Sequence, residues 1–499
     1  MSRFIQMYKK IKEYYDKGEF DKAAEIGELT ARTIRIPNEQ KFLFHEAMAM
    51  SLLRGGHGHE AWQHIYRAMA CDDLPEYRHA KQRLYSNCLV YLHIIPELSD
   101  DELFRMHAGY GELFNHIQPY VHDWQRHAAH KKIKIGYISP DFYEHIVTNF
   151  AIQLYSAYDR SRFEVYLYHT GYNHNNVTDW LKNLADGWYE LKGKAPAEAA
   201  RQIFDDGIDI LMDLSGHTKG GYTLQVMSYK PAPIQISGIG YFNTTGLPAV
   251  DYYLSDKYCD PPGNEALFTE KLLRLPHSHF CYTPPETVLE CKRKWQRHNP
   301  VVFGSFSNFL KLNDRTLSTW KRIMDSVPSS RLLLKNVRKG QRELNDLAQR
   351  MSTLGFAMER VELREGSLYY LDQYADMDIA LDPFPYPGGG TTCEAIYMGV
   401  PVITLYGRRH GSRFGYSLLS NIGLEELTAR TEAEYIEKAV GLALAPELLT
   451  DLHANLRELM RASPVMDVKN YMAEVQSVYE VIYRSWLDTG VQIADTNCR

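Results

Sequence analysis

The stretch Asp378-Ile-Ala-Leu-Asp-Pro-Phe-Pro-Tyr-Pro-Gly388-Gly-Gly-Thr391-Thr392-Cys-Glu394-Ala-Ile-Tyr-Met-Gly399-Val-Pro401-Val-Ile-Thr carries the clearest sign of the fold. It predicts a buried strand, a rigid proline turn, a glycine-rich loop, a helix stopped by a glycine, and a second strand. Glycines let the backbone approach a ligand, and a helix N-terminus attracts anions. The pattern therefore predicts a diphosphate site at Gly390, Thr391 and Thr392.

Short, β-branched apolar runs alternate with helical stretches on both sides of this segment, in two consecutive series. The first series is 133–139, 163–168, 208–214, 234–239 and 251–255, and the second is 301–307, 331–335, 360–363, 378–383 and 401–405. This alternation predicts two Rossmann-like, doubly wound α/β domains, 126–290 and 291–499, with closing C-terminal helices in the second. A ligand is expected between them, at the carboxyl ends of the strands.

The first 125 residues are predicted to be all helical. Two segments share a helical-hairpin signature, Gly18-Glu-Phe-Asp-Lys-Ala23 and Gly56-His-Gly-His-Glu-Ala61. Their spacing of 38 residues is close to the tetratricopeptide period of about 34. A short, degenerate helical-repeat region is therefore predicted, and an ordinary helical bundle fits the pattern about as well.

Composition excludes several classes of protein. The chain has 499 residues, of which 44% are hydrophobic and 24% charged, as in an average globular protein. Its net charge of −6 gives no global positive field for nucleic acid. The seven cysteines are scattered without a CxxC pair, and no stretch offers the ~18 apolar residues of a membrane span. The N-terminus also lacks the apolar core of a secretory signal, so a cytoplasmic protein is expected.

Several polar residues follow the predicted strands and are candidates for the site. Asn308 and Lys311 follow the strand at 301–307, and Lys335 ends the next one. A cation here would stabilise a departing nucleoside diphosphate, although most lysines are simply solvated. Glu394 is expected in the first helical turn, either on the ribose hydroxyls or only complementing the helix dipole.

Two further candidates follow the first strand, in Gly136-Tyr-Ile-Ser-Pro-Asp141-Phe-Tyr-Glu-His145. His145 could act as a general base or hold the acceptor hydroxyl, although a histidine is more often structural. Asp376-Met-Asp378 has the spacing of a metal-binding DxD motif. Because Asp378 opens a strand, it is expected at the sheet edge away from the ligand, and no metal is expected.

Taken together, these motifs resemble the SPINDLY and O-GlcNAc transferase family of peptide O-glycosyltransferases over about residues 103–462. Further motifs carry the resemblance: Asp213-Leu-Ser-Gly-His217-Thr, Pro231-Ala-Pro-Ile-Gln235, Gly240-Tyr-Phe-Asn-Thr-Thr-Gly246 and Gly304-Ser-Phe. The SPINDLY branch is the more similar one. The resemblance implies a GT-B core behind helical repeats, and a metal-independent, inverting transfer of a sugar to Ser or Thr without a cofactor.

The resemblance also implies roles for individual residues. His145 takes the place of the cleft histidine and Lys311 that of the leaving-group lysine. The donor side would comprise Asn308, Lys335, Tyr370, Gly390, Thr391, Thr392 and Glu394, and the acceptor and sugar side Asp141, His217, Tyr241 and Asn243. Three departures concern Phe242, Tyr370 and the loop Gly388-Gly-Gly, where the family usually has proline, histidine and more side chains.

The donor is expected to be UDP-GlcNAc, the commoner family donor, with GDP-fucose as the alternative. The partners would be a nucleotide sugar and a protein or peptide acceptor, and a homodimer through the helical region is compatible with the sequence. Two rival functions are an Asn-directed N-glucosyltransferase and a catalytically inactive helical-repeat scaffold. The segments His217-Thr and Asn243-Thr-Thr-Gly favour the O-linked enzyme over the first. The joint presence of His145, Lys311, Thr391, Thr392 and Glu394 argues against the second.

Overall fold

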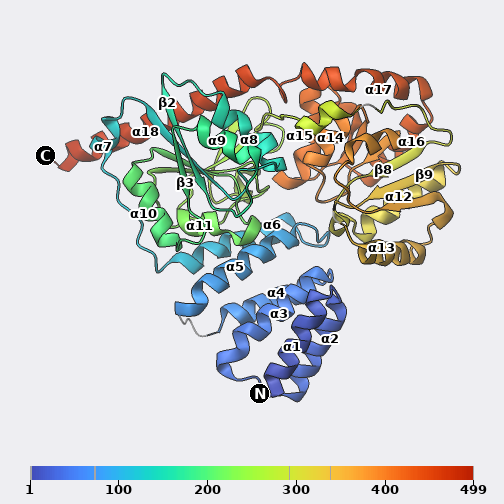
Figure 1. Cartoon of the computed structure of the whole chain (residues 1–499), viewed down its shortest axis with the longest axis horizontal. Helices are drawn as coiled ribbons and strands as arrows, with labels where there is room; N and C mark the ends of the chain where they lie inside the picture. The colour runs from blue at the N-terminus through green and yellow to red at the C-terminus, as the bar shows by residue number, and fades with distance from the viewer. Residues whose placement is uncertain (1–2, 72–74, 292, 338, 498–499) are drawn as a thin grey trace.

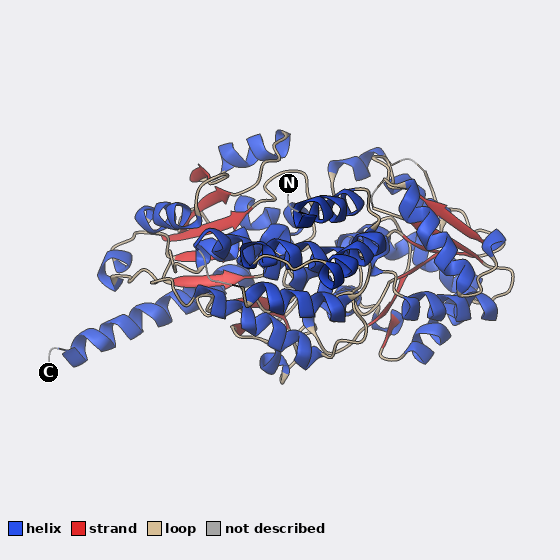
Figure 2. Cartoon of the chain, turned by 90° about the horizontal axis from the view of Figure 1, so that it is seen from below, coloured by secondary structure: helices blue, strands red, loops and turns tan. Residues whose placement is uncertain are grey.

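The structure, a computed structural model, describes residues 3–71, 75–291, 293–337 and 339–497. A helical N-terminal region precedes two α/β domains, and a long helix ends the chain (Figure 1). Both domains contain a parallel sheet with helices around it, as Figure 2 shows. The fold class predicted from the sequence is therefore confirmed.

The N-terminal region consists mainly of helices that pair with their neighbours in the chain. They are α1 (Arg3–Asp16), α2 (Phe20–Thr33), α3 (Lys41–Arg54), α4 (Gly58–Met69), α5 (Pro75–Leu92) and α6 (Asp100–Ala108). Gly18 and Gly56 turn the chain between paired helices with left-handed φ angles of 74° and 88°. Ala23 and Ala61 are fully buried where the helices approach. The two predicted helical hairpins are therefore confirmed.

The first sheet has the strand order β3-β2-β1-β4-β5-β6-β7, and all its pairings are parallel. Its strands are β1 (Ile133–Ser139), β2 (Phe163–His169), β3 (Gly187–Glu190), β4 (Ile210–Asp213), β5 (Ile234–Ser237), β6 (Tyr252–Asp256) and β7 (Lys271–Leu275). The helices of this domain are α7 (Trp124–Ala128), α8 (Ile146–Ser156), α9 (Asn176–Leu184), α10 (Pro196–Asp206) and α11 (Tyr222–Met227).

The second sheet has the parallel order β10-β9-β8-β11-β12-β13. Its strands are β8 (Val302–Ser305), β9 (Arg331–Lys335), β10 (Val361–Arg364), β11 (Ile379–Leu381), β12 (Val402–Leu405) and β13 (Thr428–Ala429). The helices are α12 (Asp314–Ser326), α13 (Gln341–Thr353), α14 (Gly390–Tyr397), α15 (Phe414–Ile422), α16 (Glu432–Ala443) and α17 (Pro446–Arg461). All ten strands predicted from the sequence are present within a few residues, whereas β3, β7 and β13 were not predicted.

The helical region and the first sheet share one hydrophobic core. Leu84 and Leu89 of α5 belong to the same buried cluster as Ile138 of β1 and Leu211 of β4. The helical region therefore forms a structural unit with the first α/β domain and is not an appendage to it.

The last helix, α18 (Val468–Asn497), returns from the second domain and packs along the first (Figure 1). The Tyr479 hydroxyl lies 3.3 Å from that of Tyr137 in β1, and the backbone N–H of Asp159 donates to Gln476 at 2.7 Å. None of the helices in the described part of the chain combines the length and the apolar composition that crossing a bilayer needs.

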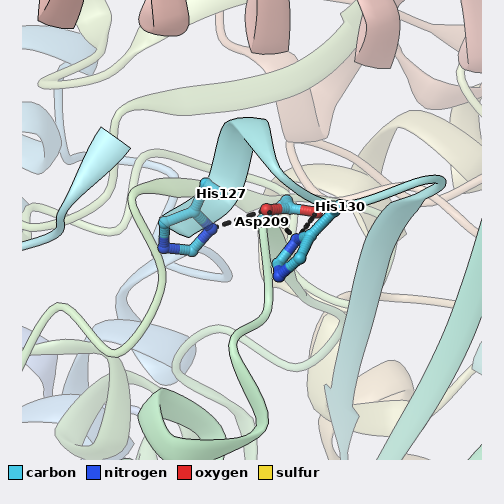
Figure 3. Close-up of side chains that lie close together, drawn as sticks. All are labelled: His127, His130 and Asp209. Atoms are coloured by element: carbon cyan, nitrogen blue, oxygen red, sulfur yellow. Dashed lines mark hydrogen bonds and ion pairs between the residues drawn. The ribbon is translucent and has the colours of Figure 1, made fainter. Parts of the chain in front are cut away.

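A buried carboxylate joins the segment that includes α7 to the first sheet, at the amino end of β4 (Figure 3). Asp209 accepts hydrogen bonds from the Nδ1 atoms of His127, at 2.6 Å, and His130, at 3.0 Å, and from the backbone N–H of Lys134, at 2.8 Å. From α18, the Tyr483 hydroxyl donates to the His127 carbonyl at 2.8 Å. This group of side chains lies at the amino ends of the strands, whereas the candidate site lies at their carboxyl ends.

Candidate functional site

Two helix N-termini meet where the carboxyl ends of the two sheets face each other, a region called the junction below. α8 follows β1 of the first domain, and α14 follows β11 of the second. A Cβ added at Gly390, the first residue of α14, would overlap the side chain of Ile146, the first residue of α8. Because each helix N-terminus carries partial positive charge, the junction attracts an anion from both sides.

A buried carboxylate, Asp382, holds the glycine-rich loop in place. It accepts a hydrogen bond from the Gly388 backbone N–H at 2.7 Å and lies within 3.3 Å of the hydroxyls of Thr392 and Thr404. Burial raises the pKa of Asp382 to about 6. Asp382 was not among the predicted site residues. Its position directly after a strand and before the glycines was the signal that could have identified it.

Lys311 lies beside the same loop. Its ammonium donates to the Pro387 carbonyl at 2.7 Å and sits over the ring of Tyr386, 4.3 Å from the ring centre. Burial lowers the pKa of Lys311 to about 8, and the negative charge of Asp382 partly opposes this shift. The structure thus brings Lys311 together with the glycine loop, and Tyr386 is a neighbour that sequence reasoning missed.

Glu394 lies in the second turn of α14, because the helix begins at Gly390; the predicted place in the first turn is wrong. Its carboxylate accepts a hydrogen bond from the Tyr370 hydroxyl at 2.5 Å and lies 3.2 Å from that of Tyr374. The Tyr374 hydroxyl is also 3.1 Å from the Thr391 carbonyl. Burial raises the pKa of Glu394 to about 7. Tyr370 and Glu394, both predicted on the donor side, are therefore in direct contact.

The other two predicted donor-side residues have local partners. Asn308 caps the short helical turn Phe309–Lys311, since its side chain accepts from the backbone N–H of Leu310 at 3.1 Å. Lys335 is buried at the carboxyl end of β9, and its ammonium donates to the Glu365 carbonyl. Burial lowers the pKa of Lys335. Among the described residues, neither side chain forms a hydrogen bond with the glycine loop.

On the opposite side of the junction, His145 and Asp141 form a second group. His145 caps α8, because its Nδ1 accepts a hydrogen bond from the Val147 backbone N–H at 3.3 Å. Asp141 is buried, pairs with Lys219, and has one carboxylate oxygen 3.7 Å from His145 Nδ1. With the Nδ1 lone pair occupied, neutral His145 presents an Nε2 hydrogen. This geometry favours holding a hydroxyl over removing its proton.

Three residues predicted on the acceptor and sugar side are buried, and two of them, His217 and Tyr241, lie where the helical region packs on the first domain. His217 Nδ1 lies 2.8 Å from the Ser86 hydroxyl, and its Nε2 lies 2.9 Å from the Thr245 carbonyl. The Tyr241 hydroxyl lies between two histidines of the helical region. Asn243 accepts from the Thr244 backbone N–H at 2.9 Å. The partners of His217 and Tyr241 in the helical region are more than a hundred positions away in the chain, so the local motifs could not reveal these contacts.

The acidic pair of the DxD-like motif has structural partners. Asp378 precedes β11 and accepts from the Trp295 indole at 3.0 Å and the Val302 backbone N–H at 2.7 Å. Asp376 pairs with Arg364 at 2.6 Å. Among the described residues, two groups bring three metal-ligand atoms within 4.8 Å of one another: His127, His130, Asp209 and Asp256, Cys259, His279. In both groups, the carboxylate is already hydrogen bonded to histidine.

The sequence matches Glycosyl transferase family 41 over residues 113–288 and 281–475. It is 36% identical over 433 residues to the probable UDP-N-acetylglucosamine–peptide N-acetylglucosaminyltransferase SPINDLY of Solanum lycopersicum, covering 84% of this chain and 45% of the relative. The Arabidopsis thaliana protein of the same name is 36% identical, with 83% and 46% coverage. The chain therefore spans about half the length of these relatives.

A solved structure is similar over nearly the whole length of both chains. It is a mutant O-GlcNAc transferase from Thermobaculum terrenum, 27% identical, with a TM-score of 0.79 and coverage of 98% of this chain and 99% of the other. The helical region, the two α/β domains and the returning helix are thus all included in the alignment.

Proposed function

Since the chain belongs to glycosyl transferase family 41, the family its SPINDLY-like motifs predicted, we propose that it is a protein O-glycosyltransferase. It would transfer a sugar from a nucleoside diphosphate to a Ser or Thr hydroxyl. The observation that carries the proposal is the meeting of Lys311, the glycine loop and the N-terminus of α14 at one point.

In the proposed reaction, the diphosphate lies against the first N–H groups of α14. When the sugar leaves, negative charge grows on the diphosphate, and Lys311 and the two helix N-termini stabilise it. We propose that no metal takes part in this, because Asp376 and Asp378 already have other partners. The acceptor hydroxyl would attack the anomeric carbon from the side of the first domain, giving inversion. Holding both substrates in line supplies much of the rate.

Lys311 has a second feature that suits this role. In the structure its ammonium is bound to a carbonyl of the glycine loop, so a diphosphate in the loop can take over the contact with little movement of the lysine. Glu394 with Tyr370 would hold the nucleoside, after one tyrosine hydroxyl exchanges for a ribose hydroxyl. The named relatives make UDP-GlcNAc the first choice of donor, and GDP-fucose is the alternative.

The proposal is tested first with Lys311→Ala. Turnover should fall by about 100-fold or more, the usual loss when one charge-stabilising group is removed. The thermal midpoint should change little, because an ammonium contributes little to the core. Donor hydrolysis and peptide modification measure the first, and a melting curve measures the second. A large fall in the thermal midpoint together with the loss of turnover would contradict the assignment.

A thermal-shift screen with UDP, GDP, UDP-GlcNAc and GDP-fucose identifies the donor. Mass spectrometry of the modified peptides then shows which side chain carries the sugar. Sugar on Asn in place of Ser or Thr would identify the chain as an N-glycosyltransferase, and the absence of any lysine-dependent turnover would indicate a scaffold.

A further inference from the structure

A chain of hydrogen bonds runs from the helical region into the first domain. His107 Nδ1 lies 2.7 Å from the Leu103 carbonyl, and its Nε2 lies 2.6 Å from the Tyr241 hydroxyl. The same hydroxyl lies 3.0 Å from Nε2 of His93. His93 follows the end of α5, and all three side chains are buried.

The direction of every bond in this chain follows from its first member. A carbonyl only accepts, so His107 Nδ1 carries a hydrogen, and in the neutral ring Nε2 then accepts. The Tyr241 hydroxyl therefore donates to His107 and accepts from His93 Nε2. Nδ1 of His93 is left with a bare lone pair. Burial lowers the pKa of His93 well below its usual range and that of His107 to about 4, so both rings are neutral near pH 7.

This lone pair is buried and has no partner among the residues that the structure describes. Nη1 of Arg409, a buried donor from the second domain, also has no hydrogen-bond partner among the described residues. Arg409 lies against the same part of the helical region, since its Nε is 3.6 Å from a carboxylate oxygen of Asp100, the first residue of α6. Gly411, two residues further on, approaches the ring of Tyr386, whose centre is 5.6 Å from that of His93. Buried polar groups without partners are uncommon and ask for an explanation. A hydroxyl group satisfies both, because it donates and accepts at once.

The position of this pair relates it to the proposed donor site. The His93 ring is 5.6 Å from the ring of Tyr386, and Tyr386 in turn lies beneath the Lys311 ammonium. His93 is therefore separated by one aromatic ring from the group that would bind the diphosphate.

We propose that His93 and Arg409 form a subsite for a hydroxyl group of the transferred sugar, with His93 Nδ1 accepting and Arg409 Nη1 donating. The subsite rests on the proposed function and adds to it a direct contact between the helical region and the donor. It joins three parts of the chain, because Tyr241 of the first domain fixes the ring nitrogen that His93 presents.

Isothermal titration of His93→Gln tests the subsite, with UDP against UDP-GlcNAc and GDP against GDP-fucose, using the pair that the wild type binds. The glutamine amide can still donate to Tyr241 but has nothing in the place of Nδ1. Affinity for the nucleotide sugar should fall about tenfold, the effect of one lost hydrogen bond, and affinity for the nucleoside diphosphate should not change. Arg409→Lys, which keeps the charge but loses Nη1, should give the same selective loss.

Tyr85→Phe is the matched control, because it removes a neighbouring hydrogen bond, from the Tyr85 hydroxyl to the Met106 carbonyl at 2.8 Å. It should leave the ratio of the two affinities unchanged. If both variants bind both ligands like the wild type, or lose both equally, a buried water fills the pair and the subsite is refuted. A wild-type protein that binds no nucleoside diphosphate would overturn the proposed function together with the subsite.

Discussion

At the scale of single residues, Lys311 and Asp382 influence each other's protonation. Burial lowers the pKa of Lys311 to about 8, and the charge of Asp382 keeps it from falling further. Only the protonated lysine can stabilise a leaving diphosphate, so kcat/KM should decline as pH rises through about 8.

Asp382→Asn should move that decline to lower pH. The asparagine oxygen still accepts from Gly388, whereas the charge that raises the lysine pKa is gone. The pH profile of kcat/KM, compared with the wild type, measures the shift. An alkaline limb that stays in place would mean that another group controls it.

Glu394 gives a prediction about stability. Its pKa is about 7 in the folded protein, against 4.5 in its ordinary state, so ionisation costs folding free energy as pH rises between these values. Glu394→Gln does not ionise, and should be more stable than the wild type at pH above about 7 by at most about 3 kcal/mol. Near pH 4.5 the gain should vanish. Melting curves at both pH values measure it, and a gain independent of pH would contradict this account.

How far the sequence predicts a residue's place depends on where its partners are. Lys311 and Thr391 were placed beside the junction because each closely follows the carboxyl end of a strand, which is a local property. Tyr241 and His217 were predicted on the acceptor and sugar side, and the structure shows in addition that both contact the helical region. Their partners, Ser86 and His93, are more than a hundred positions away, and no local pattern records such a contact.

At the scale of elements, Thr391 and Thr392 at the start of α14 have different expected roles, ligand binding for the first and stability for the second. The Thr392 hydroxyl lies 3.3 Å from Asp382 and ties the helix to the end of β11. Thr392→Val should therefore lower the free energy of unfolding by about 1 kcal/mol. Thr391→Val should leave stability nearly unchanged and weaken nucleoside diphosphate binding. Melting curves and titration distinguish the two, and the reverse pattern would contradict the proposed roles.

The three strands that the sequence did not predict all lie at the edge of a sheet. β3 and β7 are the two edges of the first sheet, and β13 is an edge of the second. An edge strand carries polar residues on its exposed side and is often short. β7 includes Lys271 and Arg274, and β13 has two residues. Interior strands read as apolar runs because helices cover both faces, so the sequence predicts the middle of each sheet better than its borders.

At the scale of the whole molecule, the helical region and the first domain should unfold together. Gly246 has a left-handed φ of 68°, and a Cβ there would overlap the backbone carbonyl of His107 in α6. Gly246→Ala should lower the free energy of unfolding by about 2 kcal/mol or more, and the melting curve should keep one transition for these parts.

Gly56→Ala is the matched control for this variant. Gly56 also has a left-handed φ, of 88°, but no atom lies within 4 Å of an added Cβ. It should carry only the backbone strain, about 1 kcal/mol. Equal effects of the two variants would mean that contact with the helical region adds nothing to stability.

The return of α18 to the first domain has a mechanical consequence. The polypeptide crosses between the two α/β halves twice, once after β7 and once before α18, where Tyr479 and Gln476 fasten it to the first half. The two crossings together form a hinge between the halves, and the line that joins them is the hinge axis. We expect the halves to swing about that axis with a single degree of freedom, so that every closure returns donor and acceptor to the same alignment.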